Sequence, residues 1–144
     1  MRTLIITLFA VTFVFFGCNE TKRVIDGAAN IQLSGAYNIT NAGDMQVSNP
    51  DIQLNFSALD RSFRGNGGCN SFFGNYTLDL YALSFNDIAA TEKYCDEAIM
   101  TTENEIMEAL RNTGSYSYEN SILTLYSKTD RSVLLTAKKE KREN

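Results

Sequence analysis

The chain has 144 residues, of which 13 are lysine or arginine and 17 are aspartate or glutamate, giving a net charge of −4. A mildly acidic chain is a poor candidate for binding nucleic acid, whose phosphates attract basic surfaces. Because the chain contains no histidine, a Ser-His-Asp or Cys-His catalytic site is ruled out. Its few cysteines do not complete a zinc site either. We therefore expect a protein that is not an enzyme and holds no cofactor.

Residues 1–17 are predicted to be a secretory signal peptide. Arg2 gives the chain a basic start, and residues 4–16 form an apolar run interrupted only by two threonines. A run of this length after a basic start is typical of a signal peptide. It is too short to span a bilayer, which takes roughly 20 apolar residues. A buried core helix is the alternative.

The four residues from Phe15 to Cys18 resemble the bacterial lipobox through Gly17 and Cys18, although the two phenylalanines depart from its preferred residues. The resemblance implies that Cys18 is lipidated and anchors the mature chain in the bacterial cell envelope. Each acyl CH₂ buried in the bilayer contributes about 0.8 kcal/mol to membrane binding, so two or three acyl chains anchor the protein stably. We expect an outer membrane lipoprotein, with the membrane face left open, and a polar tether over residues 18–30. Plain secretion with a free Cys18 is the alternative.

The cysteine count suggests a disulfide. With Cys18 lipidated, Cys69 and Cys95 remain as an even pair in an oxidising compartment. Their bridge would close a loop of about 26 residues and contribute roughly 3 to 3.5 kcal/mol in the chain-entropy model. Two buried free thiols are the alternative.

Most of the remaining chain reads as short strands. In residues 51–59, Ile52, Leu54 and Phe56 alternate with polar residues, which is the pattern of a half-buried strand. A weaker strand is predicted at 89–94. The strands predicted with the clearest pattern cover residues 34–40, 51–59, 62–66, 74–80, 82–88, 114–120, 121–127 and 132–138.

One segment, residues 102–112, has helical spacing. Thr102 and Glu105 match a capping box at its start, and a stripe of Ile106, Met107 and Leu110 predicts a core-facing side. The sequence therefore predicts an α+β domain over residues 31–138, in which an antiparallel sheet curls into a small barrel-like meander with one packed helix. Residues 139–144 are predicted to be a charged tail.

Three motifs follow one another along the chain. The first is Gly-Cys-Asn-x-Phe-x-Gly-x-Tyr, the second Ile-x-x-Thr-x-x-x-Cys, and the third a helix starting with glutamate. The motif residues are Gly68, Cys69, Asn70, Phe72, Gly74 and Tyr76, then Ile88, Thr91 and Cys95, then Glu103, Ile106 and Leu110. Together with the closing pair of strands, these motifs and their order resemble the META domain family, which includes HslJ-like envelope lipoproteins. The family often begins with Gly-x-Trp, where this chain has Gly35-Ala36-Tyr37.

The resemblance implies a small barrel with a helix, an envelope maintenance or stress role, and no established catalytic residues. We interpret the motif as mainly structural. Gly68 and Gly74 suit positive φ or close backbone approach, Asn70 suits tying a turn, and Phe72 and Tyr76 suit the core. The acidic helix residues, Glu103 included, are expected on caps or solvated faces rather than as acid–base pairs.

Binding remains as the expected function. The first hypothesis is a lipid-anchored protein that binds another envelope or secreted protein. The second is an inhibitor of a secreted peptidase that inserts a loop, with residues 65–75 and 40–51 as the candidate loops, because a stapled loop loses less entropy on docking. The third is a carrier of a small apolar ligand inside the barrel.

Overall fold

The structure is a computed structural model that describes residues 28–141. The predicted signal peptide (1–17), Cys18 and most of the predicted tether lie outside the described residues, as do residues 142–144 of the predicted tail. The elements are β1 (Gly35–Ala42), β2 (Met45–Gln46), β3 (Gln53–Ser57), β4 (Ser62–Asn66), β5 (Ser71–Asp79), β6 (Ala82–Ala90), α3 (Glu97–Asn112), β7 (Thr113–Glu119), β8 (Ile122–Ser127) and β9 (Val133–Lys139).

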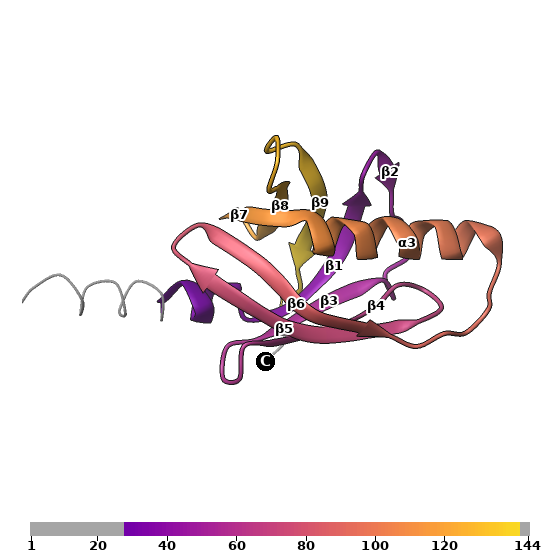
Figure 1. The fold of residues 1–144 in the computed structure, drawn as a ribbon, viewed down its shortest axis with the longest axis horizontal. Coiled ribbons are helices and arrows are strands. Elements are labelled where there is room, and N and C mark those ends of the chain that lie inside the picture. Colours follow the sequence, from indigo (N-terminus) through magenta and orange to yellow (C-terminus); the bar gives the residue numbers. More distant parts are fainter. Residues whose placement is uncertain (1–27, 142–144) are drawn as a thin grey trace, which may run out of the picture.

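The strands form one antiparallel sheet in which β1 also pairs with β9, so the sheet closes into an eight-stranded barrel (Figure 1). The short strand β2 pairs with the end of β1 and lies outside the ring. The α+β barrel predicted from the sequence is confirmed. Its weakest seam lies between β6 and β7, where the ladder holds the single pair Ala82 and Ser115.

Aromatic and aliphatic side chains fill the barrel. They come from alternate positions of each strand, because successive residues of a strand point to opposite faces. Tyr37 is fully buried; its ring meets that of Phe56 edge-on at 5.8 Å, and its hydroxyl donates to the Leu33 carbonyl at 2.8 Å. Fully buried side chains include Tyr37, Ile39, Leu54, Phe56, Phe63, Phe72, Tyr76, Leu83, Leu123 and Leu135.

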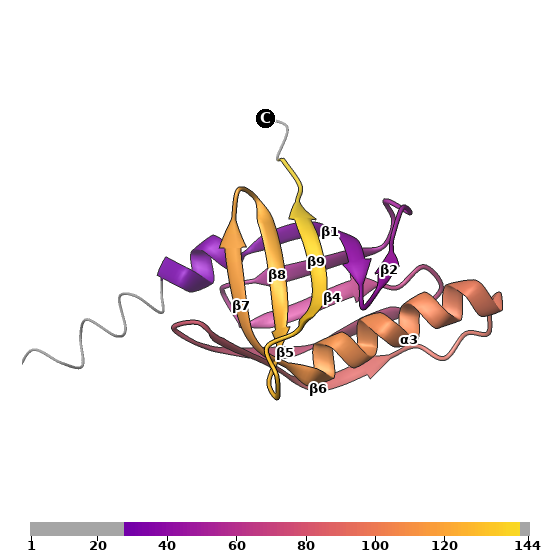
Figure 2. The same cartoon turned by 90° about the horizontal axis from the view of Figure 1, so that it is seen from above.

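The helix α3 lies along β6 and also contacts β1, β8 and β9, so it covers one side of the barrel opening (Figure 2). It begins at Glu97, five residues before the predicted start. The capping box was therefore wrong: Thr102 lies inside the helix, and its hydroxyl donates to the Ala98 carbonyl at 3.1 Å. Ile106, Met107 and Leu110 are buried as the helical stripe predicted.

Three predicted loop or tether segments are more ordered than expected. Residues 65–75 belong mostly to β4 and β5, which leaves only residues 67–70 as a turn. The segment 40–51 contains the end of β1 and all of β2. Residues 28–33 are helical and bury Leu33, so the packed domain begins before residue 31, within the predicted tether. The prediction of a weaker strand at 89–94 was wrong for residues 91–94: β6 ends at Ala90, and the linker 91–96 follows it.

Candidate functional site

Three of the motif residues, Asn70, Thr91 and Glu103, meet in one hydrogen-bonded network around Asn70. The Asn70 Oδ1 accepts bonds from the Thr91 hydroxyl (2.8 Å) and from the Lys93 N–H (2.7 Å). Its Nδ2 donates to Glu103 Oε2 (2.8 Å) and to the Lys93 carbonyl (3.1 Å), while its backbone N–H donates to Glu103 Oε1. One side chain therefore ties the turn 67–70 to the linker 91–96 and to α3.

Glu103 is the largest surprise in this network. The sequence placed it on a cap or a solvated face, but it is only 7% exposed. Its carboxylate faces the turn 67–70, and a Cβ on Gly67 would lie 2.3 Å from its Cγ, so Gly67 is needed for this close approach. A signal was present in the sequence: Glu103 shares the helix face of Ile106 and Leu110, at spacings of three and seven residues.

A disulfide fastens the same region covalently. The structure joins Cys69 in the turn to Cys95 in the linker, with the two Cα atoms 6.2 Å apart. Gly68, beside Cys69, has a φ of +109°, a backbone conformation that glycine adopts without steric cost. The disulfide and the Asn70 network therefore hold one end of the barrel rigid.

Three further motif residues lie in β5. Phe72 and Tyr76 are buried, and the Tyr76 hydroxyl donates to the Ser57 carbonyl at 3.2 Å. Burial raises the pKa of Tyr76. Gly74 lies opposite Phe63, and a Cβ there would lie 2.6 Å from the Asn86 carbonyl oxygen, where a bulge in β6 approaches. All these contacts are internal, so they stabilise the scaffold.

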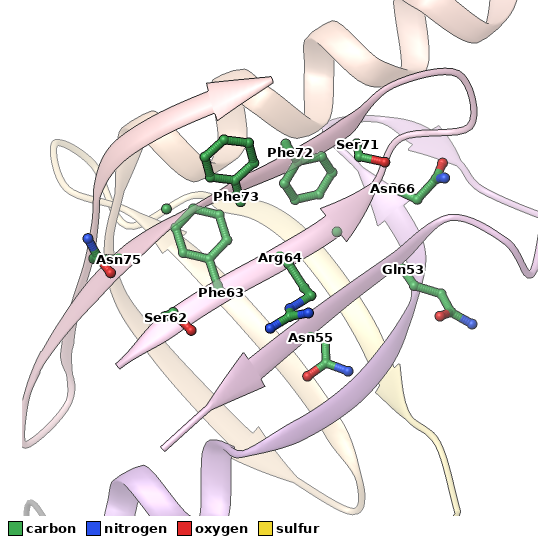
Figure 3. A pocket seen from close by; sticks show the side chains of 12 residues that line it. Gln53, Asn55, Ser62, Phe63, Arg64, Asn66, Ser71, Phe72, Phe73 and Asn75 are labelled. Carbon is green, nitrogen blue, oxygen red and sulfur yellow. The ribbon is translucent and has the colours of Figure 1, made fainter. Parts of the chain in front are cut away.

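A different set of side chains lines the outer face of β3, β4 and β5, around a groove of about 630 Å³ (Figure 3). The strand register places Asn55, Arg64 and Phe73 directly opposite one another in a row across the three strands. Flanking rows carry amides and hydroxyls. We call this surface the β3–β5 face; its polar members are Gln53, Asn55, Ser62, Arg64, Asn66, Ser71 and Asn75.

The centre of the β3–β5 face combines an exposed aromatic ring with a cation. Phe73 is 54% exposed. Arg64 is exposed beside it, and its side chain makes no hydrogen bond or ion pair within the described part of the chain, so the five N–H donors of its guanidinium group are available. Sequence reasoning missed both residues. The available signal was a phenylalanine at a solvent-facing position of β5, between the buried Phe72 and Gly74.

A second groove, of about 460 Å³, runs between the linker 91–96 and α3. Met100, Met107 and the exposed Tyr94 line it together with Asn70 and Glu103 of the network. The two polar network residues already bond to each other there. This groove is therefore smaller than the one on the β3–β5 face, and two of its polar side chains are already used in an internal hydrogen bond.

The titratable groups suit structural roles. The pKa of Asp60 is lowered to about 2, first by the hydroxyl of Ser57 and then by that of Ser62. The pKa of Asp130 is lowered to about 2 in the same way, by the hydroxyl groups of Ser127 and Ser132. Such carboxylates are weak bases. Among residues 28–141, no group of three or more His, Cys, Asp or Glu side chains is placed to hold a metal ion, and no helix there is long and apolar enough to cross a membrane.

A closed antiparallel barrel with one packed helix and a polar outer groove defines a class of small α+β barrel domains. The META domain family model matches residues 29–140, and the chain belongs to this family. The family places it among envelope-associated proteins of uncertain function.

Solved structures share the fold. A protein from Burkholderia xenovorans, determined by NMR, superposes with a TM-score of 0.65 at 23% identity, covering 81% of this chain and 89% of its own. A crystal structure of a DUF4847 family protein from Bacteroides vulgatus gives a TM-score of 0.58 at 16% identity, covering 81% of this chain and 99% of its own. No curated protein matches the chain.

Proposed function

We propose that this protein is a non-enzymatic lipoprotein, anchored to the outer membrane through Cys18, which binds another envelope or secreted protein through the β3–β5 face. One observation carries the proposal: Phe73 is exposed at the centre of the groove, directly opposite Arg64. Aromatic residues and arginine are enriched at the centres of protein interfaces, where few residues carry most of the binding energy.

The surroundings of these two residues favour a protein partner. The groove is open and shallow, and amide and hydroxyl side chains surround Phe73 as a polar rim. The face is also rigid, because Phe63 and Phe72 pack beneath it against Gly74 and Gly65 of the neighbouring strands. A rigid surface loses little conformational entropy when it binds.

The interior is less suited to the carrier hypothesis. Closely packed rings occupy the barrel centre: Phe56 and Tyr76 lie 5.4 Å apart between centroids, and Phe63 and Phe85 lie 4.8 Å apart. An apolar ligand would have to displace these side chains from a core packed at the density of an organic crystal. Binding at the β3–β5 face displaces no core side chains.

The inserted loop of the inhibitor hypothesis also has a weaker basis than the face. Of the candidate loop predicted at 65–75, only the turn 67–70 lies outside the strands. The Asn70 side chain in this turn points inward to Glu103. A peptidase partner would therefore be bound through the β3–β5 face. Identification of the partner distinguishes a peptidase inhibitor from an adaptor of envelope proteins.

The test is site-specific photo-crosslinking in the source cell. A photo-reactive amino acid replaces Phe73 in the full-length chain; in the control it replaces Val133, which is 52% exposed and lies on β9. We expect a stoichiometric crosslink to one protein from position 73 and none from position 133. Arg64→Ala and Phe73→Ala should each weaken binding of that protein by roughly tenfold or more. Equal crosslinking at both positions, or unchanged affinity of both variants, would refute the proposal.

A further inference from the structure

The exposed apolar side chains gather at one end of the barrel. This end, which we call the tether end, carries the helical residues 28–33 and the turns that join β3 to β4, β5 to β6 and β7 to β8. Figures 1 and 2 both show these segments together at the left of the molecule, where the described chain begins. The linker 91–96 and the start of α3 lie at the opposite end.

Five of the eight large apolar side chains exposed in the described range lie at the tether end, and the turns hold the most prominent ones. Leu59, at the tip of the β3–β4 turn, is 98% exposed, and Tyr81, in the β5–β6 turn, is 77% exposed. Neighbouring turns and helical residues contribute the others. The five are Ile31, Leu59, Leu80, Tyr81 and Ile122; the three elsewhere are Phe73, Tyr94 and Val133.

We propose that the tether end docks on the lipid bilayer, with Leu59 and Tyr81 inserted at the boundary between headgroups and acyl chains. The inference rests on the proposed lipid anchor at Cys18. Leucine at a hairpin tip can enter the acyl region without burying an unpaired side-chain polar group. Tyrosine suits the interface because its ring is apolar and its hydroxyl stays hydrated.

The length of the tether supports this orientation. Nine residues, 19–27, separate Cys18 from the described chain, and even fully extended they reach only about 30 Å. The nine-residue strands β5 and β6 each span about 30 Å as well. The tether end can therefore rest on the membrane with a slack tether, whereas the opposite end would need the tether stretched along the whole barrel.

Charges at the tether end are of both signs, since Asp60 and Arg61 follow Leu59 and Lys139 lies near the turn before Ile122. Docking should therefore depend on the apolar side chains and not on anionic lipid. The docked orientation leaves the disulfide and the Asn70 network at the far end and the β3–β5 face on the side, open to a partner.

The absence of tryptophan from the chain makes a direct test possible. Single variants Leu59→Trp, Tyr81→Trp and Tyr94→Trp each introduce one fluorophore at an exposed site. Tyr94, 91% exposed in the linker 91–96, is the control at the opposite end. Each full-length variant is isolated from membranes, its lipidation at Cys18 is verified by mass spectrometry, and it is reconstituted into phosphatidylcholine vesicles with or without brominated acyl chains.

We expect bromine to quench the L59W and Y81W fluorescence at least twofold and to leave that of Y94W nearly unchanged. Circular dichroism should show the same fold for all three variants, because the substituted side chains are exposed. If a lipidated chain is quenched equally at all three positions, or at none, the docking inference is overturned while the anchor stands. If Cys18 carries no lipid, the anchoring proposal fails and the inference fails with it.

Discussion

Replacing Asn70 with alanine should destabilise the domain more than any other single truncation of a polar side chain in the turn 67–70. The change removes four side-chain hydrogen bonds, two accepted from Thr91 and Lys93 and two donated to Glu103 and Lys93. It also leaves the buried Glu103 carboxylate with one donor fewer. The turn, the linker and α3 lose their common connection.

The expected cost follows from the kind of bond that is lost. A neutral hydrogen bond contributes about 1 kcal/mol net and one to a charged group about 1.5–3 kcal/mol. Thr91 is exposed and can bond to water instead, so its bond should count for little. The sum for the Lys93 and Glu103 bonds is about 3–5 kcal/mol of unfolding free energy.

Urea unfolding of the oxidised domain, followed by circular dichroism, measures this free energy. The matched control is Asn75→Ala, which truncates an exposed asparagine on the outer face of β5, the strand that follows the turn, and should change stability by no more than about 0.5 kcal/mol. Thr91→Val should fall between the two. A cost below about 1 kcal/mol for Asn70→Ala would contradict the view that this network holds the barrel end.

Three further outcomes follow from the structure. Reduction of the disulfide should lower the unfolding free energy by roughly 3 to 3.5 kcal/mol, read from urea curves with and without reductant, because the open chain gains entropy when unfolded. Gly74→Ala should destabilise by about 1–3 kcal/mol in the same assay, since its Cβ would meet the Asn86 carbonyl oxygen at 2.6 Å. By NMR titration, Asp60 should titrate near pH 2, and Ser57→Ala should raise that midpoint. Because the folded pKa of Asp60 is depressed, its contribution to stability should be present above about pH 4 and be lost as the pH falls towards 2.

Much of the fold could be predicted because it depends on local pattern. The alternation around Leu54 predicted β3, and the strands predicted at 74–80 and 82–88 correspond to β5 and β6. The three closing strands were predicted in the same way. These features depend on the alternation of apolar and polar residues along a strand, which can be read directly from the sequence.

The errors occurred where contacts between distant segments decide the structure. Thr102 and Glu105 have the spacing of a capping box, yet α3 starts at Glu97, two residues after the linker residue Cys95 that the disulfide fixes to the turn 67–70. Glu103 is buried only because Asn70, 33 positions earlier in the chain, supplies its donors. Neither partner is visible in a local window of sequence.

The candidate binding face was missed for a related reason, and its position follows from the geometry of the motif itself. The family motif specifies Phe72, Gly74 and Tyr76 and leaves the positions between them open. Because side chains of a strand alternate, the specified positions point into the barrel and the open ones point outward. The open position 73 holds the phenylalanine at the centre of the β3–β5 face. The motif therefore identifies the scaffold, and the side chains of the proposed binding face lie at positions that the motif does not specify.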